Sequence, residues 1–98
     1  MSALNNAQIR HLKSLAHPLK PVVLIGEKGV TQAVIDEIGV ALKAHELIKV
    51  KIRCEEREER DGMIEQICRK AGAQKVQRVG HTLTLFKRSK AMKIALPK

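Results

Sequence analysis

The sequence predicts an α/β fold, a single compact domain in which one four-stranded sheet carries helices mostly on one face. Apolar residues make up 44% of the 98 residues, which is enough for one modest core. The apolar spacing changes along the chain between the two-residue period of strands and the 3.6-residue period of helices. Turn residues separate these segments, and the resulting order over residues 1–98 is α-β-α-β-α-β-β.

The first predicted element is a short helix over residues 5–16. Asn5 is the expected N-cap, and Gln8 three residues later completes a capping box. The helix should end at His17-Pro18, because a proline disfavours helical geometry in the residue before it.

A buried strand, a glycine turn and a second helix come next. The apolar run Val22–Ile25 indicates a buried strand that ends at the turn Gly26-Glu27-Lys28-Gly29. Beyond the turn the apolar residues follow helical spacing to about Ala44, and Thr31 is a plausible N-cap.

A strand that ends in two glycines at a helix N-terminus can bind an anion. Glycine allows another molecule to approach the backbone closely, and the first helical N–H groups lack internal partners. A phosphate is the expected ligand of the turn Gly26–Gly29. The motif is neither a P-loop nor a dinucleotide fingerprint, and a connection that needs glycine only to turn is equally consistent with it.

The second strand carries a row of cations. Its apolar residues alternate with basic ones, so one face should be packed and the other exposed to water. A solvated strand face and a phosphate-contacting face both fit this pattern. The apolar set is Ile48, Val50, Ile52 and Cys54, and the basic set is Lys49, Lys51 and Arg53.

A third helix and a hairpin complete the domain. The mixed-charge run 55–61 suits the start of a helix that ends at Gly72, and these acids should lie away from any polyanion. Strands 76–79 and 82–87 flank Gly80-His81, a pair that suits a type II′ turn. Leu83 and Leu85 should then face the core.

The net charge of +9 favours a polyanionic partner, and its distribution is uneven. Residues 66–98 contain nine lysines and arginines and no acid, and the basic tail 88–98 is expected to form a disordered arm. Phe86 is the single aromatic residue, which argues against base stacking on exposed rings. No run reaches membrane-spanning length, so we expect a cytoplasmic protein with reduced cysteines and no membrane partner.

Several stretches of this chain resemble the CRM domain, the chloroplast RNA splicing and ribosome maturation module, in its stand-alone bacterial YhbY-type form. The resemblance extends from Leu12 to about Lys98 and is most specific over His45–Lys51. The other matching positions are 15–23, Gly26 and Gly29 with Thr31, Ala41-Leu42, Gly72-Ala73, and Gly80 followed by Thr82-Leu83.

The resemblance implies a fold similar to the C-terminal domain of translation initiation factor three, with a glycine loop that works like that of KH domains. It implies association with large-subunit ribosomal RNA and its assembly precursors. An acid at Glu27 departs from the family's loops and repels phosphate. The expected RNA-contact residues are Lys20, Gly26, Glu27, Lys28, Gly29, Thr31, Lys49, Lys51, Arg53 and Arg88.

The predicted function is therefore a non-enzymatic RNA-binding protein that acts in large ribosomal subunit assembly. We expect a monomer with no cofactor, no small-molecule substrate, and no catalytic or metal-ligating residue. The alternative is an enzyme that binds a mononucleotide at the Gly26–Gly29 turn, although no hydroxyl has an evident histidine-plus-acid partner. A duplex DNA binder is disfavoured, because the helix after the turn has no basic face for the major groove.

Overall fold

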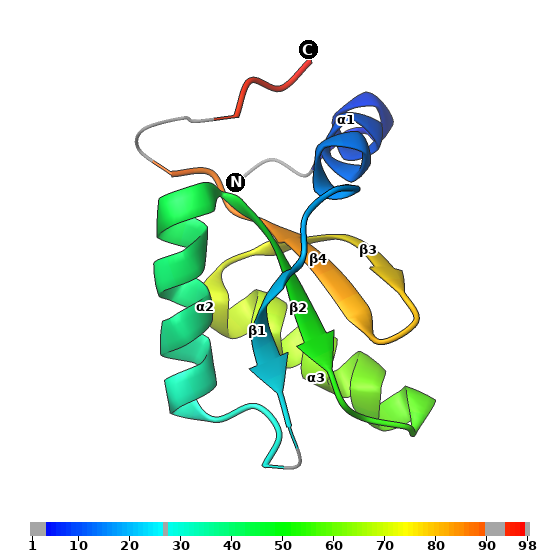
Figure 1. Cartoon of the computed structure of the whole chain (residues 1–98), viewed down its shortest axis with the longest axis vertical. Helices are drawn as coiled ribbons and strands as arrows, with labels where there is room; N and C mark the ends of the chain where they lie inside the picture. The colour runs from blue at the N-terminus through cyan, green and yellow to red at the C-terminus, as the bar shows by residue number, and fades with distance from the viewer. Residues whose placement is uncertain (1–3, 27, 90–93, 98) are drawn as a thin grey trace.

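Three helices and a four-stranded sheet make up the part of the chain that the computed structural model describes, residues 4–26, 28–89 and 94–97 (Figure 1). Their order confirms the predicted α/β fold. The elements are α1 (Asn6–Ala16), β1 (Pro21–Ile25), α2 (Gln32–His45), β2 (Leu47–Ile52), α3 (Arg57–Ala71), β3 (Gln74–Val79) and β4 (Thr82–Phe86).

The strand order in the sheet is β1-β2-β4-β3. β1 and β2 are parallel and are joined through α2, whereas the other neighbouring strands are antiparallel. Parallel strands end at the same edge of a sheet, and here the Arg53 N–H donates to the Ile25 carbonyl at 2.9 Å. The Ile52 N–H donates to the His81 carbonyl at 2.7 Å, which brings the β3–β4 turn to this same edge.

The larger core lies between one face of the sheet and the helices α2 and α3, which pack against each other. In Figure 1 this face points away from the viewer, and α3 crosses behind the sheet. Alternation in β2 accounts for the packing, because every second residue of the strand points to this core. Its members with no exposed surface are Ile25, Ile38, Val50, Ile67, Leu83 and Leu85.

A second, smaller core lies on the opposite face, where α1 packs on β2, β3 and β4. Its buried residues are Leu12, Ala16, Leu47, Val76 and Phe86. The placement of helices mostly on one face is therefore correct for α2 and α3. Leu85 and Phe86 are neighbours in β4 and point to opposite faces of the sheet. Both are buried, because α1 covers the face to which Phe86 points.

The prediction that Val22–Ile25 form a buried strand was wrong for two of the four side chains. Val23 and Ile25 are buried in the larger core, but Val22 and Leu24 remain 51% and 50% exposed. β1 is an edge strand, and the helix on its other face packs on β2, β3 and β4. The second face of β1 is thus open to solvent.

The capping and turn residues identified in the sequence correctly predicted where α1, α2 and the hairpin strands begin or end. The Gln8 N–H donates to Asn5 Oδ1 at 2.8 Å and the Asn5 N–H donates to Gln8 Oε1 at 3.0 Å, which confirms the capping box. Thr31 caps α2 through the Val34 N–H at 3.2 Å. The hairpin turns at Gly80, whose φ of +59° suits the predicted turn.

A buried carboxylate ties the segment after β4 to the rest of the domain. Glu46 has no exposed surface, and its Oε2 accepts hydrogen bonds of 2.6 Å from both the N–H and the hydroxyl of Ser89. Its Oε1 accepts the Ile94 N–H at 2.8 Å. Burial alone would raise the pKa of Glu46, but these hydrogen bonds and the charge of Arg88 outweigh it and lower the pKa.

The described part of the basic tail is packed rather than a free arm. Ile94 and Leu96 join the smaller core, and the Gln8 side chain donates to the Pro97 carbonyl at 3.0 Å. The lysines of residues 90–93 and 98 lie outside the described residues.

We predict that Glu46→Gln lowers the free energy of unfolding by about 1–3 kcal/mol at pH 7, because an amide cannot accept all three hydrogen bonds. A carboxylate whose pKa is lowered by folding stabilises the protein above its unfolded-state pKa, near 4.5 for Glu46. This stabilisation is lost as the pH falls through the lower, folded-state pKa.

Urea unfolding at a series of pH values measures this effect. The wild type should lose stability below about pH 4.5 more steeply than the variant. Equal pH dependence of the two proteins would show that the Glu46 carboxylate does not stabilise the fold.

Candidate nucleic-acid interface

A row of cations lies on the sheet face that α2 and α3 do not cover. Lys49 and Lys51 project from β2 on this face, since Ile48, Val50 and Ile52 point to the larger core. Arg53 continues the row beyond the strand, as predicted. Lys49 is half-buried and donates to the His17 carbonyl at 3.5 Å, whereas Lys51 and Arg53 are exposed.

Within the described part of the chain, no carboxylate neutralises the cations of this row. Among residues 4–26, 28–89 and 94–97, no carboxylate oxygen lies within 4.0 Å of the charged groups of Lys20, Lys49, Lys51 or Arg53. In those ranges Glu55 Oε1 lies 3.8 Å from a histidine nitrogen, His81 Nε2. Unpaired cations in a row release counterions when they bind a polyanion, which favours association.

The glycine turn lies at the end of this row, at the edge where β1 and β2 both end. The Gly29 N–H donates to the Gly26 carbonyl at 3.0 Å, and Gly29 has a φ of +72°. Apart from its two chain neighbours, no described residue has a heavy atom within 4 Å of the position that a Cβ on Gly26 would occupy. The two glycines thus differ, because Gly29 is required by the backbone whereas Gly26 leaves space for an approaching molecule.

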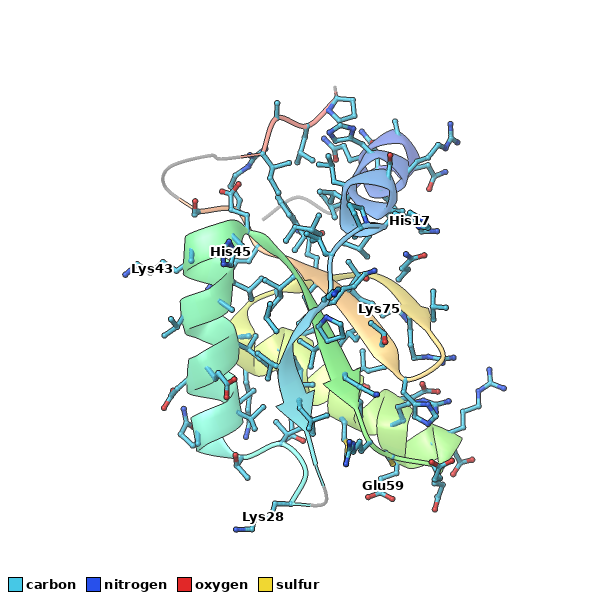
Figure 2. The ribbon with its side chains drawn as sticks, viewed as in Figure 1. His17, Lys28, Lys43, His45, Glu59 and Lys75 are labelled. Carbon is cyan, nitrogen blue, oxygen red and sulfur yellow. The ribbon has the colours of Figure 1, made fainter. Side chains whose placement is uncertain are left out.

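Lys28 extends from the tip of this turn away from the domain (Figure 2). Its side chain is exposed, so it can meet a phosphate without displacing other contacts. Glu27, the other residue between the glycines, lies outside the described residues.

Most of the predicted contact residues lie on one side of the structure. Two do not fit this group, because one has a structural role and the other lies elsewhere. Thr31 uses its hydroxyl to cap α2. Arg88 follows β4 at the opposite end of the sheet, where it donates to the Ile94 carbonyl at 2.6 Å and lies over the Phe86 ring. Lys20 is exposed immediately before β1 and lies beside the row.

The shared edge forms a hollow of about 460 Å³ next to the glycine turn. It is lined by Leu24 and Gly26 from the first strand and turn, by Lys51, Arg53 and Glu55, and by His81. The acidic run was predicted to lie away from any polyanion, but Glu55 lies in this hollow, with its Oε1 3.8 Å from His81 Nε2.

Sequence reasoning did not identify Leu24 or His81 as part of this surface. His81 looked like a turn residue, and only the pairing of β4 with β2 places it beside Gly26. A second, more apolar hollow of about 480 Å³ lies between the end of α1 and the open face, and Lys20 and Lys49 are among its lining residues. Its apolar walls were also missed, because the first strand was expected to be buried.

The described residues contain no group of three or more histidine, cysteine, aspartate or glutamate side chains that could hold a metal ion. No helix in the described ranges is long and apolar enough to cross a membrane. Both cysteines in those ranges are free thiols.

Comparison with known proteins identifies the family. The model of the CRS1 / YhbY (CRM) domain matches residues 4–87. The chain belongs to the CRM family. The solution structure of a Staphylococcus aureus protein, described there as "a putative RNA binding protein", has a TM-score of 0.84 and 30% identity, and it covers 97% of this chain and 100% of that one.

Two bacterial CRM relatives are matched over almost their entire length. A Haemophilus influenzae protein named "RNA-binding protein" is 45% identical over 98 residues, which span 100% of this chain and 99% of the relative. A Bacillus subtilis protein named "Probable RNA-binding protein YqeI" is 39% identical over 95 residues, 96% of this chain and 99% of its own. These relatives are thus stand-alone CRM domains.

We predict that Gly29→Ala lowers the free energy of unfolding of this CRM domain, whereas Gly26→Ala leaves it unchanged. At Gly29 an added Cβ would lie 3.6 Å from Met63 Cε, an ordinary contact, so the cost comes from the left-handed backbone and should be about 1–2 kcal/mol. Urea unfolding measures the free energy of unfolding of both variants against that of the wild type. Equal stability of the two would contradict the assigned turn geometry.

Proposed function

We propose that this protein binds RNA through its sugar–phosphate backbone, with the open sheet face and the glycine turn as the binding surface. The main observation behind the proposal is the row Lys49, Lys51 and Arg53, which no carboxylate of the described residues neutralises and which leads directly to the turn at Gly26. Family membership and the names of the bacterial relatives support RNA as the nucleic acid.

Each part of the surface has a distinct chemical role in this proposal. The row of cations supplies charge at several successive phosphates, which a single point charge cannot do. The open space at Gly26 allows a backbone to approach the turn, and Lys28 at the tip adds a further cation. Glu55 beside the row repels phosphate and so limits where the strand can lie.

We further propose that the RNA is that of the large ribosomal subunit and its precursors, which the protein binds in the cytoplasm as a non-enzymatic monomer. The resemblance in residues 45–51 to stand-alone bacterial CRM proteins supports this assignment. The open shape of both hollows also suits a long polymer that passes through them better than it suits an enclosed substrate.

We predict that replacing Lys49, Lys51 and Arg53 together by alanine weakens RNA binding and reduces its salt dependence. Each lost phosphate contact removes about 0.7 from the slope of log affinity against log salt for a single strand, so the slope should fall by about 2. Fluorescence anisotropy with a labelled RNA at several salt concentrations measures both quantities.

A matched control removes the same charge from α2 and α3, the helices that cover the other face of the sheet. Lys43 lies on the last turn of α2, and Arg69 and Lys70 lie on the last turn of α3. Replacing these three by alanine should leave the slope nearly unchanged. If both triple variants lose affinity equally, net charge and not the row attracts the RNA.

We predict that the tagged protein sediments with large-subunit precursors when a cell lysate is run on a low-salt sucrose gradient. The triple variant of the row should remain at the top, and the control triple variant should travel with the wild type. Gly26→Ala should shift part of the protein to the top, because its Cβ fills the space at the turn. A wild type that stays at the top while still binding RNA in solution would overturn the ribosomal assignment alone.

A further inference from the structure

Exposed apolar side chains gather beside the cationic row. The described residues include six large apolar side chains that are exposed, and four of them lie between positions 15 and 24. These are Leu15, Leu19, Val22 and Leu24, whereas Val40 and Val79 are on α2 and β3. Isolated exposed apolar residues are ordinary, but a group of them next to a charged row indicates a binding surface.

The apolar side chains form walls of the hollow between the end of α1 and the open sheet face. Leu15, Leu19 and Val22 line this hollow of about 480 Å³ together with the cations Lys20 and Lys49. Its size is that of a small-molecule site. Apolar walls next to cations match the two halves of a nucleotide, whose base has flat apolar faces and whose phosphate is an anion.

The same combination occurs a second time, nearer to the glycine turn. There Leu24 lines the hollow of about 460 Å³ with Lys51 and Arg53. Val22 and Leu24 are two residues apart on β1, and Lys49 and Lys51 are two residues apart on β2, so both sets repeat along one face. A repeated apolar-plus-cation unit is complementary to a nucleic-acid strand, which repeats base and phosphate.

Only an unpaired base can enter such a hollow. In a duplex the faces of the bases are stacked on one another and only their edges are accessible, whereas single-stranded segments can present whole bases. Stacking on a Phe, Tyr or Trp ring is not available here, because Phe86 is the only such residue of the sequence and is 2% exposed. The exposed aliphatic side chains provide the apolar contact instead.

We infer that this surface binds unpaired bases of single-stranded RNA. The bases lie against the exposed apolar side chains and the phosphates on the adjacent cations; the apolar side chains are Leu15, Leu19, Val22 and Leu24. The inference rests on the proposed RNA-binding function and specifies its ligand. It predicts a preference for single strands over duplexes, which the cationic row alone does not.

Val22→Ser tests the inference, because this side chain is half exposed and its loss does not open the core. The variant should bind an unstructured RNA oligonucleotide roughly five- to tenfold more weakly than the wild type, since apolar burial against a base is lost. The salt slope should not change, because no phosphate contact is removed. Binding to a duplex RNA and to an abasic oligonucleotide should be equal for the two proteins.

Val79→Ser is the matched control, because Val79 is also exposed on an edge strand but lies at the far edge of the sheet from β1. It should bind every RNA as the wild type does, and thermal melting should show both variants folded.

If Val22→Ser binds single strands like the wild type while the triple variant of the cationic row loses affinity, RNA binding stands and the apolar surface serves a protein segment instead. If neither Val22→Ser nor the triple variant of the cationic row changes the affinity for RNA, the proposed function itself fails. A wild type that prefers duplex RNA would also overturn the inference.

Discussion

The parallel pairing of β1 and β2 is the constraint on which the rest of this structure depends. Two parallel neighbours need a crossover that returns the chain to the starting edge, and α2 provides it while covering one face. Both strands then end at the same edge, where the Arg53 N–H bonds to the Ile25 carbonyl. The glycine turn and the cationic row, 20 and more residues apart in the chain, meet there for this reason.

The two faces of the sheet are used for different purposes, and α1 sets the division. The face under α2 and α3 holds the larger core and provides most of the buried apolar surface. On the other face α1 and the C-terminal segment cover a smaller core around Leu47 and Phe86. What remains open is the part that carries Lys49, Lys51, Val22 and Leu24. Stability is thus concentrated away from the surface proposed to bind, which leaves that surface free to be cationic.

Those features of the fold and of the site that depend on local sequence were predictable. The caps at Asn5 and Thr31 follow from hydrogen bonds to residues three positions away. The cationic row follows from strict alternation in β2, whose residues must point to opposite faces. The exposure of Val22 could not be predicted, because it depends on where α1 packs. Nor could the burial of Glu46, whose hydrogen-bond partner Ser89 is 43 residues distant in the chain.

The Glu46 carboxylate also determines where the described ends of the chain emerge. By holding Ser89 and Ile94 it directs the segment after β4 toward α1, where Gln8 bonds to the Pro97 carbonyl and the Leu4 N–H bonds to Gln74. Both α1 and the C-terminal segment, drawn in red, lie at the end of the molecule opposite to the glycine turn (Figure 1). A fluorescent protein, an immobilisation tag or a second copy of the domain can accordingly be fused at either terminus without obstructing the turn.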